Sequence, residues 1–95
     1  MAKPITAVIT GASSCIGEAT AWRFAREPGA RVILVARREE RLRNLASALP
    51  IEASWVATDL TDAEAPAKIL AHVERHYGEL NLLVNNAGAS WRSTF

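Results

Sequence analysis

A stretch of glycine and small polar residues, TGASSCIG, runs from Thr10 to Gly17 between an apolar run and a segment of helical character. Gly11 permits a tight turn, and the small side chains after it let backbone amides come close to an anion. A helix that begins near Ile16 would point its positive end at that anion, and Gly17 would let the helix pack closely on the preceding strand. The pattern predicts a phosphate-binding loop. Taken alone, it fits an ordinary strand–helix turn equally well.

Two arginines, Arg37 and Arg38, come directly after a second apolar run at residues 32–36. At the end of such a strand, an acidic residue binds the ribose hydroxyls of NAD, whereas an arginine accommodates the 2′-phosphate of NADP. No acidic residue stands at this point, so the sequence favours NADP over NAD as the cofactor. The alternative is that both arginines simply begin a charged helix.

Four short apolar runs alternate with three segments of helical periodicity. The runs predict buried strands at residues 5–9, 32–36, 53–57 and 80–84. Helices are expected at residues 16–27 and 37–49, and from an N-cap at Thr61 or Asp62 to about Tyr77. The apolar stripes of the last two helices consist of Leu42, Leu45, Ala46 and Leu49, and of Ile69, Leu70 and Val73.

Buried strands joined by helices form a parallel sheet with right-handed crossovers. The predicted fold is therefore α/β, half of a doubly wound parallel sheet with strand order 3-2-1-4. In that order the sheet reverses direction between its first and fourth strands, and ligands bind beyond the carboxyl ends of the strands at this point. The stretch Thr10–Gly17 and the sequence Asn-Asn-Ala-Gly at Asn85–Gly88 both belong there. Two polar loops at one predicted crevice favour a ligand site more strongly than either motif alone.

At these residues the chain resembles the N-terminal half of a short-chain dehydrogenase/reductase. The family's T-G-x-x-x-G-x-G is matched at Thr10, Gly11 and Gly17, and its N-N-A-G is matched in full at Asn85–Gly88. The pair Asp59-Leu60, after the third strand, is similar to the family's adenine-contacting D-V/L. These three motifs in this order are together highly specific.

The resemblance covers residues 5–88 and implies a Rossmann-type fold, so residues 1–95 would form one truncated dinucleotide-binding domain. It also implies that the parent enzyme is an NADP-dependent oxidoreductase that interconverts an alcohol and a carbonyl. Each loop would hold one part of the cofactor. The implied residues are Gly11, Ser13, Ser14, Cys15, Ile16 and Gly17 at the pyrophosphate and adjoining ribose, Arg37 and Arg38 at the 2′-phosphate, Asp59 and Leu60 at the adenine, and Asn86, Ala87 and Gly88 at the adenine-side ribose.

Cys15 departs from the family's pattern, because it stands where the motif has its second glycine. Its Cβ and sulfur would lie where the backbone approaches the pyrophosphate. A positive φ at this position would cost about 1 kcal/mol, which corresponds to roughly tenfold weaker binding. A cysteine at a helix N-terminus is also a candidate reactive thiol. A tolerated exchange of one small residue for another is the simpler interpretation.

The family's catalytic Ser and Tyr-x-x-x-Lys come after N-N-A-G and have no counterpart in these 95 residues. Tyr77 is the only tyrosine, and Gly-Glu-Leu-Asn follows it, so no lysine stands at the family's spacing. We therefore expect the chain to carry the cofactor-binding half and to be inactive alone, because hydride transfer would lack its proton partner. The alternative is a stand-alone nucleotide-binding or regulatory fragment without catalysis.

Composition narrows the expected partners. Eleven basic and ten acidic residues leave a formal net charge of +1, which gives no general attraction to nucleic acid or membranes. The single cysteine excludes an internal disulfide and fits a reducing compartment, so we expect a cytoplasmic protein. The fourth strand would leave an apolar edge, which favours self-association and marginal stability in isolation.

His72 and His76 lie one helical turn apart and invite a metal interpretation. A zinc-protease helix needs a glutamate directly after the first histidine, and this chain has Val73 there. No third ligand is evident from the sequence. We therefore interpret this segment as a solvated helix face and expect no metal.

Overall fold

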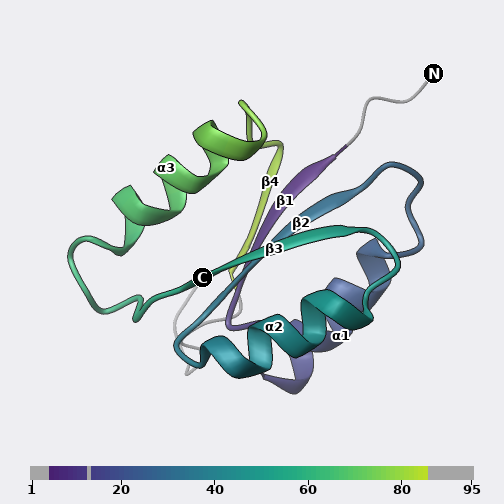
Figure 1. Ribbon diagram of the computed structural model, residues 1–95, viewed down its shortest axis with the longest axis horizontal. Helices are drawn as coiled ribbons and strands as arrows, with labels where there is room; N and C mark the ends of the chain where they lie inside the picture. Colours follow the sequence, from purple (N-terminus) through teal and green to yellow (C-terminus); the bar gives the residue numbers. More distant parts are fainter. Residues whose placement is uncertain (1–4, 13, 86–95) are drawn as a thin grey trace.

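The computed structural model describes residues 5–12 and 14–85 of the chain, and Figure 1 shows them as a sheet between two layers of helix. The strands within these residues are β1 (Thr6–Thr10), β2 (Arg31–Ala36), β3 (Glu52–Ala57) and β4 (Leu82–Asn85). The helices are α1 (Cys15–Phe24), α2 (Glu39–Ala48) and α3 (Ala65–His76). All strand pairs are parallel and the order is β3-β2-β1-β4, so the predicted α/β fold with order 3-2-1-4 is confirmed.

Helices cover both faces of the sheet, as a doubly wound fold requires. In Figure 1, α1 and α2 lie together on one side and α3 lies on the other. Alternate strand residues point to opposite faces, so Ile9 and Leu34 pack with α2 residues such as Leu42, while Val8 and Ile33 pack with Val73 of α3. The continuous burial of β1 and β2 follows from this two-sided cover.

The strand register brings the ends of β1 and β4 together. Ala7 pairs with Leu82, and the ladder continues to Thr10 beside Asn85. The Thr10 hydroxyl donates to Asn85 Oδ1 at 2.9 Å, which ties the start of the glycine-rich turn to the first residue of N-N-A-G. The two polar loops therefore leave the same edge of the sheet, as predicted.

Helix α2 begins at Glu39, so Arg37 and Arg38 precede it instead of forming its first turn. The stripe of Leu42, Leu45 and Leu49 is buried as expected. Helix α1 ends at Phe24 rather than at residue 27, and the chain then turns toward β2.

Helix α3 differs more from the prediction, because it begins at Ala65. Asp62 does not cap it: Asp62 Oδ1 accepts a hydrogen bond from the Glu64 backbone N–H and closes a turn before the helix. Val73 is buried, but Leu70 is 54% exposed, so the expected burial of Leu70 is wrong. Residues 69 and 73 share one face of the helix, and position 70 lies about 100° around from 69, away from the sheet.

Candidate functional site

The turn after β1 is held by a network around Ser14. Gly11 has φ 65°, in the left-handed region that glycine adopts without strain. The Ser14 hydroxyl donates to the Gly11 carbonyl at 2.7 Å and accepts from the Gly17 backbone N–H at 3.0 Å, so Ser14 is the N-cap of α1. The turn thereby places the positive end of α1 at the carboxyl edge of the sheet, where an anion would be stabilised.

Gly17 lies against the turn so closely that no side chain fits. A Cβ added there would lie 2.8 Å from Ala12 Cα and 2.8 Å from the Gly11 carbonyl carbon, both of which are backbone atoms. The absence of a side chain lets α1 approach the turn after β1, which is the packing role predicted for this glycine.

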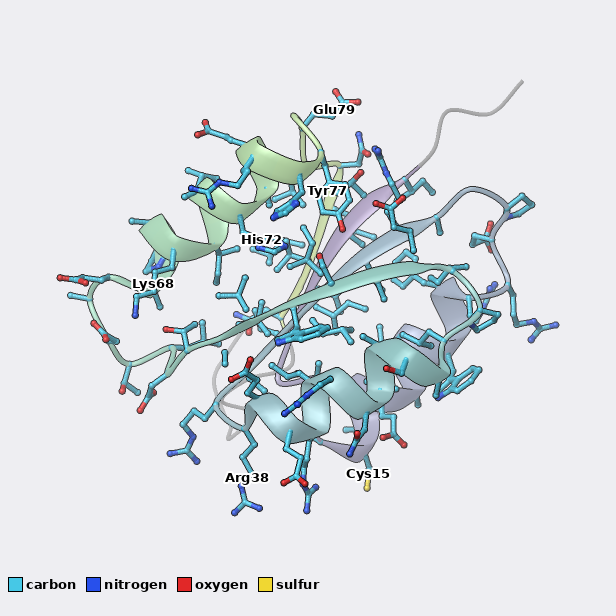
Figure 2. The ribbon with its side chains drawn as sticks, viewed as in Figure 1. Cys15, Arg38, Lys68, His72, Tyr77 and Glu79 are labelled. Carbon is cyan, nitrogen blue, oxygen red and sulfur yellow. The ribbon has the colours of Figure 1, made fainter. Side chains whose placement is uncertain are left out.

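Cys15 is the first residue of α1 and adopts helical backbone geometry. The condition for the predicted cost, a positive φ at this position, is therefore not met. The Cys15 thiol is exposed, and Figure 2 shows it pointing away from the sheet. Ile16 is exposed beside it.

The ends of β2 and β3 bring Arg37 and Asp59 together. The Thr58 backbone N–H donates to the Ala36 carbonyl at 2.9 Å, which joins the two strand ends. Asp59 Oδ1 accepts from the Thr61 backbone N–H at 2.9 Å and from its hydroxyl at 2.8 Å. These hydrogen bonds, with a smaller contribution from the positive charge of Arg37, lower the pKa of Asp59. Asp59 is therefore anionic and fixed in direction at neutral pH.

The other predicted residues at these strand ends are accessible. Arg37, Arg38 and Leu60 are all exposed, and Arg38 has the extended backbone of a residue just before a helix. The structure thus brings Gly11, Ser14 and Gly17 to the edge at which Arg37 and Asp59 also lie. Four predicted residues, Ser13, Asn86, Ala87 and Gly88, lie outside the described residues.

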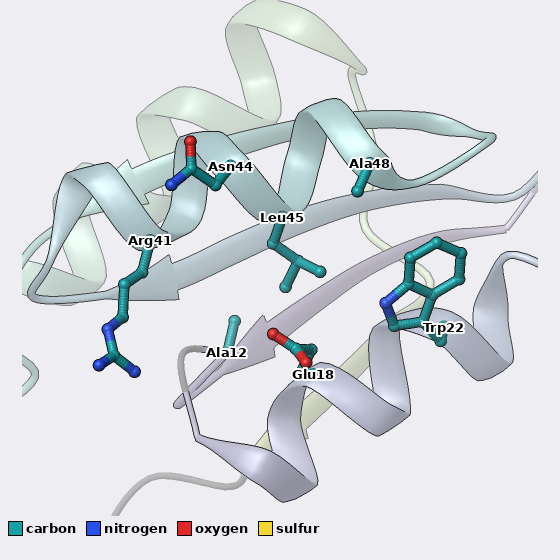
Figure 3. A pocket seen from close by; sticks show the side chains of 7 residues that line it. All are labelled: Ala12, Glu18, Trp22, Arg41, Asn44, Leu45 and Ala48. Carbon is teal, nitrogen blue, oxygen red and sulfur yellow. The ribbon is translucent and has the colours of Figure 1, made fainter.

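A pocket of about 390 Å³ opens between α1 and α2, beside the turn (Figure 3). Ala12 of the turn lines it, together with Glu18 of α1 and Arg41 and Asn44 of α2. In Figure 3 the Arg41 side chain extends from α2 on the side of the pocket where Ala12 lies. Arg41 lies in the segment predicted as a helix at residues 37–49, and the sequence did not single it out as a site residue. The available signal was its spacing of one helical turn from Arg37.

The turn, the capped and exposed N-terminus of α1 and the nearby arginines fit the phosphates of a dinucleotide. The helix end lies at the carboxyl edge, Gly17 lets the helix approach the turn, and Arg37 supplies positive charge. Within the described residues, no helix is both long and apolar enough to cross a membrane. The same residues contain no group of three or more His, Cys, Asp or Glu that could hold a metal ion.

Comparisons with known proteins agree with this geometry. Serine 3-dehydrogenase of Rhizobium radiobacter is 47% identical over 83 residues, which are 87% of this chain and 33% of that protein. An uncharacterized oxidoreductase of Staphylococcus epidermidis is 41% identical over 91 residues, which are 96% of this chain and 39% of that protein. The chain thus spans about a third of the length of the curated relatives it matches.

Solved structures give the same result. L-Sorbose reductase from Gluconobacter frateurii, complexed with NADPH and L-sorbose, superposes with a TM-score of 0.81 at 38% identity and covers 97% of this chain and 36% of its own. An alcohol dehydrogenase from Thermococcus sibiricus, complexed with 5-hydroxy-NADP, has a TM-score of 0.73 at 30% identity and covers 85% of this chain and 36% of its own. The model of the short chain dehydrogenase family matches residues 5–95. With its glycine turn, strand order and matching motifs, the chain belongs to the short-chain dehydrogenase family.

Proposed function

We propose that this chain binds NADP as the cofactor half of an oxidoreductase that interconverts an alcohol and a carbonyl. One observation carries the proposal: the Ser14-capped N-terminus of α1 and the exposed Arg37 lie at the same carboxyl edge, on neighbouring strands of a parallel sheet. This is the point at which such sheets bind dinucleotides.

Each part of the edge would hold one part of the cofactor. The amides at the start of α1 face the pyrophosphate, Arg37 and Arg38 pair with the 2′-phosphate, and Asp59 accepts from the adenine amino group. The assignments of Ser13, Asn86, Ala87 and Gly88 rest on the family resemblance and stay predictions. Cys15 and Ile16 flank the pyrophosphate as exposed residues.

NADP is the better fit than NAD because the end of β2 is followed by two exposed arginines and no acidic residue. An acid there would accept from the ribose 2′-hydroxyl and repel a phosphate. The structures of L-sorbose reductase with NADPH and of the Thermococcus sibiricus enzyme with 5-hydroxy-NADP support this choice.

The bound nicotinamide would supply hydride chemistry, and the residues of this chain would bind and orient the cofactor. None of the 95 residues matches the family's catalytic Tyr-x-x-x-Lys, so the chain would provide no general acid for the carbonyl oxygen. We propose that it binds NADP but does not turn over alone. Its compartment would be the cytoplasm.

A calorimetric titration of NADPH into the full chain tests binding, and absorbance of NADPH in the presence of small ketones tests turnover. We expect saturable binding with one site and no NADPH oxidation. Absence of saturable binding in a folded chain would refute the cofactor assignment. Steady oxidation would refute the prediction that the chain is inactive alone.

A further inference from the structure

A second pocket, of about 370 Å³, lies between α3 and β3, apart from the glycine turn. Five of its lining residues come from α3, and four of these have nitrogen-bearing side chains, namely Lys68, His72, Arg75 and His76. None of its lining residues belongs to α1, α2 or the turn after β1. In Figure 2, Lys68 lies near the start of α3 and His72 lies between this helix and the sheet. We call this the α3 pocket.

Lys68, His72 and His76 lie one above the other on α3 because they are spaced by four residues, and Arg75 follows His72 by three residues. Lys68 and Arg75 are cations, and the two histidines are bases that can accept a proton. No carboxylate lines the α3 pocket. Neither Lys68 nor Arg75 forms an ion pair within the part of the chain that the structure describes. The pocket therefore gathers uncompensated positive charge.

His72 is held in place by a hydrogen-bonded chain that starts on β3. Ser54 Oγ lies 2.8 Å from His72 Nε2 and 2.8 Å from the Tyr77 hydroxyl. The Arg31 guanidinium lies 5.1 Å from the centre of the Tyr77 ring, which adds a further cation behind this chain. The ring centres of His72 and His76 are only 4.3 Å apart. The site is thus partly preorganised, with one imidazole fixed by the sheet and a second that lies beside it at an interplanar angle of 41°.

The electrostatic environment of His72 also indicates an excess of positive charge in the α3 pocket. Burial, and then the positive charges of His76 and Arg75, lower the pKa of His72. Like charges therefore oppose each other in the α3 pocket, and a bound anion would relieve that repulsion. Glu39 does not line the pocket. Its carboxylate accepts a hydrogen bond from the indole N–H of Trp55, which is a lining residue, at 3.4 Å.

We propose that the α3 pocket binds a small phosphate-class dianion, such as a phosphate monoester or a short polyphosphate. Lys68 and Arg75 provide fixed positive charge, and the imidazoles of His72 and His76 donate hydrogen bonds to the anion. The pocket volume lies in the range of small-molecule sites. The α3 pocket is separate from the proposed dinucleotide site at the carboxyl edge, because the two share no residue.

Isothermal titration of inorganic pyrophosphate into the full chain tests the site. We expect saturable binding that weakens about 100-fold in Lys68→Gln/Arg75→Gln, since each lost charge-assisted contact costs about tenfold. Arg43→Gln, which removes an exposed cation from α2, is the matched control and should change the affinity less than about twofold. Arg37→Ala should also leave it unchanged. No saturable binding, or binding lost in Arg37→Ala but kept in the double variant, would overturn the proposal.

Sulfate at pH 7, where it is a dianion, is the probe of a second test. We expect saturable binding that weakens in His76→Ala, because this variant loses an imidazole that donates a hydrogen bond in the α3 pocket. The circular dichroism of His76→Ala should match that of the parent chain, because His76 is exposed. No saturable sulfate binding in the parent chain, or an unchanged affinity in His76→Ala, would contradict the assignment.

Discussion

The Ser14 hydroxyl accepts a hydrogen bond from the Gly17 backbone N–H at 3.0 Å while it donates to the Gly11 carbonyl at 2.7 Å. One side chain thereby closes the turn after β1 and fixes where α1 begins. The same contacts keep the remaining amides of the helix end directed at the carboxyl edge. The proposed binding of a phosphate at this turn therefore depends on Ser14 even without direct contact between its side chain and a ligand.

Replacement of this cap should weaken both the fold and the site. Ser14→Ala should lower the free energy of unfolding by about 1 kcal/mol, because the Gly17 N–H loses its acceptor. Urea unfolding followed by circular dichroism measures this change. Ser47→Ala, in which an exposed serine of α2 is exchanged, should change stability by less than about 0.5 kcal/mol. Equal effects in the two variants would contradict the capping role.

Two glycines should respond to alanine for different reasons. Gly17→Ala places a Cβ against backbone atoms of the turn and should cost about 1–3 kcal/mol while weakening NADPH binding. Gly78 has open space around its added Cβ but a φ of +85°. Gly78→Ala should therefore cost only about 1 kcal/mol from backbone strain and leave NADPH affinity unchanged. Thermal unfolding and cofactor titration of both variants distinguish the two effects.

Asp59 should make part of the stability depend on acid pH. Its pKa in the folded chain lies below the ordinary value of 3.8, mainly because Thr61 donates to the carboxylate. The unfolded state therefore takes up a proton first as the pH falls, so this stabilisation is present above pH 3.8 and is lost as the pH drops through the folded pKa. In urea unfolding, Asp59→Asn should be less stable than the parent chain at pH 7, and this difference should shrink below pH 4. A stability difference between the parent chain and Asp59→Asn that grows as the pH falls would contradict this role of Asp59.

The edge strand β4 exposes apolar side chains, with Leu82 at 43% and Leu83 at 57%. We predict that the chain self-associates through this strand, since exposed apolar strands pair with other chains. Leu83→Glu should lower the average mass in sedimentation velocity. Leu70→Glu is a matched control because Leu70 is 54% exposed but lies on α3. A parent chain that is monomeric at high concentration, or an equal response to both substitutions, would refute the prediction.

The strands, their order and the edge at which Thr10 and Asn85 meet are predictable from the sequence, because apolar runs and connection rules depend on local pattern. Helix starts are less predictable. Asp62 could cap a helix or close a turn, and its bond to the Glu64 N–H selects the turn. The backbone angles of Cys15 could not be predicted from the sequence. In the structure this residue is helical, so it carries no strain from a positive φ. The α3 pocket was missed because it requires Ser54 on β3 and His72 on α3 to meet across the layers.

We propose that Arg37 and Arg38 select NADP over NAD. The most direct measurement is the ratio of NADPH to NADH affinity in the parent chain and in Arg37→Ala/Arg38→Ala, with Arg43→Ala as control. We predict that the parent chain prefers NADPH at least about tenfold, since charge-assisted contacts to the 2′-phosphate contribute one or more factors of ten. The double variant should bind both cofactors equally, with NADH affinity unchanged. A parent chain that prefers NADH, or a double variant that keeps its preference for NADPH, would contradict the claim.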